Sequence, residues 1–191
     1  MRVIAGTLRR RTLEAPAGLK TRPTSDRLRE TLFNILAPRI EGARFLDLYA
    51  GSGAVGIEAV SRGAAKVVLV ERAEPALKVL RENLEKLGLR GAVRVEEVSV
   101  GAFLRRVRPQ TAPLLCDIVF LDPPYEAVDE YATALGLLGN DAAGILAEEA
   151  IVIAEHRRKE KLEDTYGVLR RTRLLEQGDA ALSFYGRATS S

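Results

Sequence analysis

The 191-residue sequence is poor in side chains that crosslink a chain or hold a metal, with one cysteine, one histidine and no tryptophan. A single cysteine, Cys116, excludes an internal disulfide and suits a reducing compartment. One cysteine and one histidine are also too few ligands for a zinc cage of the Cys/His type, so we expect no metal site.

Long hydrophobic runs are also lacking. No apolar stretch approaches the roughly 18–20 residues that a membrane-spanning helix needs. The opening residues 1–6 (MRVIAG) lack the longer apolar region of a secretory signal. Hydrophobic residues make up 47% of the chain, enough for one core, while its length is too short for two full domains. These features predict a soluble cytoplasmic protein, which we expect to be a monomer without membrane contact.

The net charge of +3 is unevenly distributed. Residues 1–30 carry eight basic and three acidic side chains, whereas residues 31–191 carry 21 basic and 23 acidic ones. We therefore divide the chain into a basic N-terminal extension, residues 1–30, and a domain, residues 31–191, with 13–24 as the flexible connection. Such an arm is typical of nucleic-acid binding, although charge alone equally allows a solvated arm without a partner. The candidate phosphate ligands are Arg9, Arg10, Arg11, Arg22, Arg27 and Arg29.

The rest of the chain alternates strand and helix patterns. Short apolar runs at 45–49, 66–71, 93–95 and 117–122 predict strands, and 145–154 mixes a helix end with a fifth strand. Helical spacing is found at 54–62, 75–87 and 101–107, and 168–175 with 180–185 predicts a terminal hairpin. This order predicts an α/β fold of the Rossmann-like type, with a mainly parallel seven-stranded sheet and a C-terminal antiparallel hairpin.

The first group of candidate site residues follows the first strand, in residues 47–56 (DLYAGSGAVG). Glycines at a strand-to-helix turn let the backbone approach a ligand, and the helix N-terminus offers free N–H groups. Glu71, twenty positions after Gly51, can accept both hydroxyls of a ribose. The spacing predicts a nucleoside-cofactor site, although glycines can also do no more than permit a tight turn.

The second group is Asp122-Pro123-Pro124-Tyr125, at the end of the fourth strand. Ligands of open α/β sheets collect at the carboxyl ends of strands, so we expect this tetrapeptide to face the same crevice as the glycines. The Asp122 carboxylate and the Pro123 carbonyl are two acceptors, matched to the two hydrogens of an –NH₂ group. Tyr125 offers a flat face for a planar base. Taken alone, the two prolines could simply stop a buried strand.

These motifs resemble known families. The stretch D-L-x-x-G-S-G at 47–53 resembles the first motif of class I S-adenosylmethionine-dependent methyltransferases, and D-P-P-Y resembles the catalytic motif of those that modify exocyclic amino groups of nucleic-acid bases. Residues 21–34 (TRPTSDRLRETLFN) look like the leading signature of the RsmD family of 16S ribosomal RNA guanine-N2 methyltransferases. The ends, 2–6 and 179–185, are also similar to that family.

The resemblance implies an enzyme that transfers the methyl group of S-adenosylmethionine to guanine N2 in 16S ribosomal RNA, free or within the small subunit or an assembly intermediate. It assigns catalysis to Asp122, Pro123, Pro124 and Tyr125. The cofactor-binding residues it implies are Asp47, Gly51, Ser52, Gly53, Glu71, Arg72, Ser99 and Val100. Ser99 departs from the pattern, because such enzymes often place Asp or Asn there to meet the adenine amino group.

Three alternatives share parts of this pattern. A nicotinamide-dependent oxidoreductase would use the same glycines but leaves Asp122–Tyr125 and the basic arm without a role. An adenine-N6 methyltransferase shares D-P-P-Y, yet the chain leaves little room for a domain that reads DNA sequence. A non-catalytic RNA-binding module would need only the arm. His156, beside Arg157, Arg158 and Lys159, indicates a solvated basic cluster rather than a catalytic base.

Overall fold

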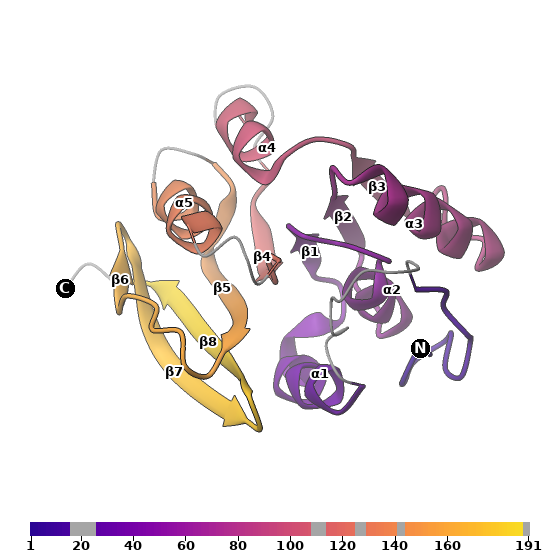
Figure 1. Cartoon of the computed structure of the whole chain (residues 1–191), viewed down its shortest axis with the longest axis horizontal. Coiled ribbons are helices and arrows are strands. Elements are labelled where there is room, and N and C mark those ends of the chain that lie inside the picture. The colour runs from indigo at the N-terminus through magenta and orange to yellow at the C-terminus, as the bar shows by residue number, and fades with distance from the viewer. Residues whose placement is uncertain (16–25, 108–113, 125–128, 141–143, 189–191) are drawn as a thin grey trace. The chain divides into compact units, whose positions relative to one another are not determined.

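The computed structural model describes residues 1–15, 26–107, 114–124, 129–140 and 144–188, which form two compact units, Met1–Val98 and Ser99–Ser191 (Figure 1). Two predicted site residues, Arg22 and Tyr125, lie outside the described residues. Within those ranges, no helix is both long and apolar enough to cross a membrane.

The first unit has three parallel strands, with β2 between β1 and β3. Its strands are β1 (Arg44–Asp47), β2 (Lys66–Val70) and β3 (Val93–Glu96), and its helices are α1 (Asp26–Ile40), α2 (Ala54–Ser61) and α3 (Glu74–Lys86). Helix α2 connects β1 to β2, and α3 connects β2 to β3, as parallel pairing requires. All three strands therefore end at the same edge, where β1 leads into the glycine turn and β2 leads into Glu71.

The second unit begins with α4 (Val100–Arg106), β4 (Cys116–Leu121), α5 (Asp129–Leu138) and β5 (Leu146–Arg157). Strands β4 and β5 are parallel. The chain then forms β6 (Thr165–Tyr166), β7 (Leu169–Gln177) and β8 (Ala180–Arg187), where β8 runs antiparallel to both β5 and β7 and β6 pairs with β7. In Figure 1, β7 and β8 are the long paired arrows at the yellow end of the chain.

The predicted α/β fold class is confirmed: helices connect parallel strands in both units, and the chain ends in an antiparallel hairpin. The described residues contain eight strands rather than seven. The additional strand, β6, has two residues, too few to show any periodicity. The mixed segment 145–154 is entirely strand from Leu146 onward, and the boundary predicted after residue 30 falls inside α1, which begins at Asp26.

The N-terminal residues 1–15 fold back on themselves within the first unit. The Val3 N–H donates to the Arg11 carbonyl and the Arg10 N–H donates to the Val3 carbonyl, both at 2.9 Å. Val3 and Leu13 are 1% and 2% exposed, so this segment has its own anchors in the core. The predicted flexible connection is therefore wrong at its first residue, Leu13, and residues 16–24 of it lie outside the described residues.

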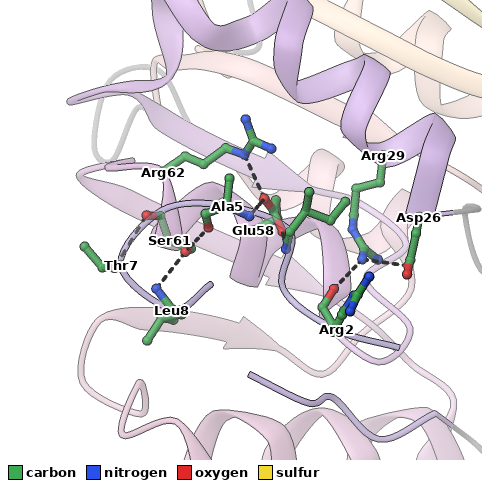
Figure 2. Close-up of polar contacts among 10 residues, drawn as sticks. Arg2, Ala5, Thr7, Leu8, Asp26, Arg29, Glu58, Ser61 and Arg62 are labelled. Carbon is green, nitrogen blue, oxygen red and sulfur yellow. Dashed lines mark hydrogen bonds and ion pairs between the residues drawn. The ribbon is translucent and has the colours of Figure 1, made fainter. Parts of the chain in front are cut away.

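The N-terminal segment is held on α2 by a buried carboxylate, Glu58 (Figure 2). Its two oxygens accept the backbone N–H groups of Ile4 and Ala5 at 2.8 and 3.0 Å, and one also accepts the Arg62 Nε–H at 2.7 Å. One turn later, the Ser61 hydroxyl accepts the Leu8 N–H and donates to the Ala5 carbonyl. The backbone N–H groups of an irregular segment are thus satisfied by helix side chains in place of a strand partner.

We predict that Glu58→Gln lowers the free energy of unfolding by about 1–3 kcal/mol, because glutamine has one acceptor oxygen and would leave a buried N–H without a partner. A urea titration followed by circular dichroism measures this. The control is Glu82→Gln on the exposed face of α3, which should stay within about 0.5 kcal/mol of the parent. Equal stability of both variants would show that Glu58 does not hold the segment.

Candidate functional site

The glycine turn after β1 is tied to the end of β2. Glu71 accepts the Gly51 N–H at 2.9 Å through one carboxylate oxygen, and the N–H groups of Arg72 and Ala73 at 2.7 and 2.8 Å through the other. The structure therefore brings together two residues that the sequence pattern assigned to one cofactor. A carboxylate has about four acceptor positions, so Glu71 keeps capacity for a further donor.

The two glycines of the turn serve different purposes. Gly53 has a φ of 82°, and a Cβ there would lie 2.4 Å from a methyl carbon of Leu80, inside the protein. Gly51 has a φ of 55°, and a Cβ there would meet nothing within 4 Å. Gly53 is therefore required by packing and by its backbone conformation. Gly51 is the glycine that borders open space, where a ligand can approach.

Asn83 on α3 supports the same turn, although it belongs to neither of the two sequence motifs. Its amide nitrogen donates to the carbonyls of Ser52 and Glu14, and its amide oxygen accepts the Glu14 N–H. The residue is fully buried between Leu80 and Leu84. A polar residue inside an apolar helical stripe was the available signal, because a buried amide must find hydrogen-bond partners.

Asp47, the last residue of β1, is a buried carboxylate, 1% exposed. Among the described residues neither of its oxygens makes a hydrogen bond of normal geometry, although the backbone N–H groups of Tyr49 and Gly56 are close enough to act on its charge. Burial raises its pKa to about 7, against the smaller lowering effect of the backbone N–H groups of Tyr49 and Gly56. A buried acceptor without such a bond is costly unless a donor or a cation is brought to it.

The remaining predicted cofactor residues divide between the units. Arg72 is exposed after β2 in the first unit. Ser99 and Val100 open the second unit, where the Ser99 hydroxyl caps α4 by accepting the Ala102 N–H at 3.3 Å, and Val100 is buried. The capping role accounts for a serine at this position, where Asp or Asn was expected, because serine is a favoured N-cap residue.

Three of the predicted catalytic residues, Asp122, Pro123 and Pro124, lie directly after β4. Asp122 is half-buried, Pro123 is buried and Pro124 is exposed. The parallel register pairs Leu121 with Ala154, so these residues lie at the edge of the sheet where β5 also ends. A carboxylate here is accessible enough to accept a hydrogen bond from a ligand and sheltered enough for that bond to be favourable.

His156 is not solvated, which corrects the prediction from its basic neighbours. It is 2% exposed, and burial lowers its pKa, so the ring is neutral. Nδ1 lies 2.9 Å from the Arg157 carbonyl, which can only accept, so Nδ1 carries the proton. Nε2 then accepts from the Ser183 hydroxyl at 2.9 Å. The ring is a structural link between β5 and β8.

The basic side chains of the N-terminal extension differ in exposure. Arg9, Arg10 and Arg11 are exposed at the turn of the N-terminal segment, and Arg27 is exposed on α1. Arg29 is 0% exposed, and its Nη2 donates to the Arg2 carbonyl at 2.6 Å and to Asp26 at 3.0 Å (Figure 2). The prediction of Arg29 as a phosphate ligand is therefore wrong, because its guanidinium braces α1 against the N-terminal segment.

The first unit thus offers a set of groups that fits a nucleoside with a cationic or N–H-donating tail. Glu71 can accept one further hydroxyl, Gly51 leaves its backbone open to approach, and the buried Asp47 carboxylate can receive a positive group. No group of three metal-ligating side chains occurs in the part of the chain that the structure describes.

Asp47→Asn should change how stability depends on pH. The folded protein keeps a proton on Asp47 up to about pH 7, whereas the unfolded chain releases it near 3.8. The parent therefore loses stability as pH rises from about 4 to 7, at up to about 1.4 kcal/mol per pH unit, and the substitution removes that loss. Melting temperatures across this range should show the variant gaining on the parent as pH rises. A constant difference, as expected for the exposed control Asp129→Asn, would contradict this.

Comparison with known proteins identifies relatives over nearly the whole chain. "Putative rRNA methyltransferase YlbH" of Bacillus subtilis is 36% identical over 185 residues, which cover 97% of this chain and 98% of that protein. "Ribosomal RNA small subunit methyltransferase D" of Escherichia coli is 39% identical over 157 residues, 81% of this chain and 74% of that one.

The fold is also shared with a solved structure, "Putative methyltransferase yhhF from Escherichia coli", with a TM-score of 0.85 and 35% identity over 100% of this chain and 99% of that one. The sequence model of the family described as "Conserved hypothetical protein 95" matches residues 1–186. The chain belongs to this family, the RsmD family that its motifs resemble.

Proposed function

We propose that this protein transfers a methyl group from S-adenosylmethionine to the exocyclic N2 of a guanine in 16S ribosomal RNA. It is an RNA methyltransferase of the RsmD family. The observation that supports transfer to an exocyclic amino group is Asp122-Pro123-Pro124 at the end of β4, and the choice of guanine N2 rests on the RsmD-like signature at residues 21–34. The relatives named as ribosomal RNA methyltransferases support RNA as the substrate.

The cofactor is S-adenosylmethionine, the methyl donor of class I methyltransferases, and it supplies an electrophilic methyl on its sulfonium when bound. Glu71 would accept a ribose hydroxyl at its remaining acceptor position. The backbone at Gly51 would lie against the ligand, and the Asp47 carboxylate would receive a cationic or N–H group. These residues orient the donor, which is the main contribution a protein makes to a transfer of this kind.

The acceptor nitrogen is a weak nucleophile, because its lone pair is delocalised into the guanine ring. Asp122 and the Pro123 carbonyl would each accept one N2–H, which stabilises the positive charge that develops on nitrogen as the new bond forms. Asp122 then holds the proton or passes it to water. Tyr125 would stack on the base, which must first leave its helix or be unpaired.

The exposed arginines of the N-terminal segment, Arg9, Arg10 and Arg11, would bind RNA phosphates, with Arg22 and Arg27 as further candidates. The anchoring through Glu58 supports this role, because a fixed turn presents its cations without the ordering cost that a flexible arm incurs on binding.

Gly51→Ala is predicted to weaken S-adenosylmethionine binding measured by calorimetry, because the added methyl would occupy the open space beside the turn. The matched control is Gly88→Ala at the far end of α3, with a φ of 68° and also nothing within 4 Å of its Cβ. Both variants bear a similar backbone strain of about 1–2 kcal/mol. Equal cofactor affinity in the two would exclude Gly51 from the binding site.

Asp122→Ala is predicted to lose about 10²–10³ in the single-turnover rate of methyl transfer, because a preorganised acceptor is removed. Asp122→Asn is predicted to lose a similar factor, because the amide keeps an acceptor oxygen but has neither the negative charge that stabilises the charge developing on N2 nor the ability to take its proton. Cofactor and RNA binding should persist, and Asp129→Asn on α5 serves as an exposed control in the same unit. Transfer of a radiolabelled methyl group to 16S ribosomal RNA measures the rate. If both Asp122 variants stay within a few-fold of the parent, the proposed mechanism fails.

A further inference from the structure

A second group of cations lies beside the proposed catalytic residues, in the turn that follows β5. Arg158, Lys159 and Lys161 are exposed there, and Arg157, the last residue of β5, is half-buried. We call Arg158, Lys159 and Lys161 the β5 turn cations. The proposed function makes no use of them.

The sheet register places this turn at the catalytic edge of the second unit. Strands β4 and β5 are parallel, and Leu121 is level with Ala154. Asp122 directly follows Leu121, the last residue of β4, whereas β5 continues for three residues after Ala154 and ends at Arg157, where the turn begins. Asp122, Pro123 and the β5 turn cations therefore lie at the same edge of the sheet. The cations are a few residues farther along the strand direction than Asp122 and Pro123.

The turn is held in place rather than tethered loosely. The Arg158 N–H donates to the Asp179 carbonyl at 2.8 Å, which joins the turn to the β7–β8 hairpin. The Glu160 N–H donates to the Arg157 carbonyl at 2.9 Å and closes the turn. His156 before it and Leu162 after it are both buried. The three cations are thus presented by a backbone anchored at both ends.

None of the β5 turn cations forms an ion pair with a described carboxylate, although Glu163 and Asp179 are exposed next to the turn. Among residues 157–162 the only acid is Glu160, which is half-buried and accepts the Arg157 N–H. Asp164, which precedes β6, pairs with Arg171 of β7. An anchored, exposed cluster of three cations that form no ion pair with a described carboxylate is a surface for a polyanion.

We propose that Arg158, Lys159 and Lys161 bind phosphates of the RNA strand next to the target base. This inference rests on the proposed function, since a base whose amino group is held by Asp122 carries its own phosphates along the same edge of the sheet. The β5 turn cations would position the nucleotide and would take no part in the chemistry.

The test compares two triple variants of the full chain. Replacing Arg158, Lys159 and Lys161 with alanine removes three charges at the turn, and replacing Lys66, Lys78 and Arg90 with alanine removes three exposed charges from the first unit. Binding of 16S ribosomal RNA and of small ribosomal subunits is measured across a salt series. The turn variant should lose about tenfold or more in affinity at low salt, and its log–log salt slope should flatten by about 2, or roughly 0.7 for each contact.

A charge-conserving variant, Arg158→Lys with Lys159→Arg and Lys161→Arg, should keep the parent's slope, and calorimetry should show unchanged cofactor affinity in all variants. Equal slopes for the two alanine variants would overturn this inference while leaving the proposed function intact. If the parent itself neither binds nor methylates the RNA, the proposed function fails instead.

Discussion

The parallel pairing of neighbouring strands determines where the candidate functional residues of each unit lie. Because β1 and β2 run in the same direction, the glycine turn and Glu71 follow neighbouring strand ends, close enough for Glu71 to accept the Gly51 N–H. In the second unit, the pairing of β4 with β5 aligns Asp122 with the residues that lead into the β5 turn. Within each unit, segments far apart in the sequence therefore meet at one edge, without any need for the helices to contribute ligands.

Two buried or half-buried carboxylates hold segments of the first unit that are neither helix nor strand. Glu71 closes the glycine turn and Glu58 holds the N-terminal segment, each by accepting backbone N–H groups that have no strand partner. Asp47 is buried but makes no hydrogen bond of normal geometry among the described residues, and its pKa of about 7 reflects that burial. Glu71 and Glu58 therefore hold backbone segments within the fold, whereas the buried Asp47 carboxylate has the capacity to accept a further donor.

Periodicity and turn residues were enough to predict the α/β class, the C-terminal hairpin and the place of the two motifs after their strands. Contacts between distant segments could not be predicted in this way. Arg29 was interpreted as a surface cation because charge patterns carry no information on burial, and the docking of residues 1–15 depends on Glu58, 54 positions after Ile4. His156 was misjudged for the same reason, since its partner Ser183 is on β8.

Methylation of guanine N2 is tested by identifying the methylated nucleoside in the product RNA. The purified protein is incubated with small ribosomal subunits or 16S ribosomal RNA and with S-adenosylmethionine whose methyl group is isotopically labelled, and the RNA is digested for mass spectrometry of its nucleosides. We expect labelled N2-methylguanosine with the parent protein and its loss with Asp122→Ala. Label recovered as N6-methyladenosine, or no label in RNA while the cofactor binds, would contradict it.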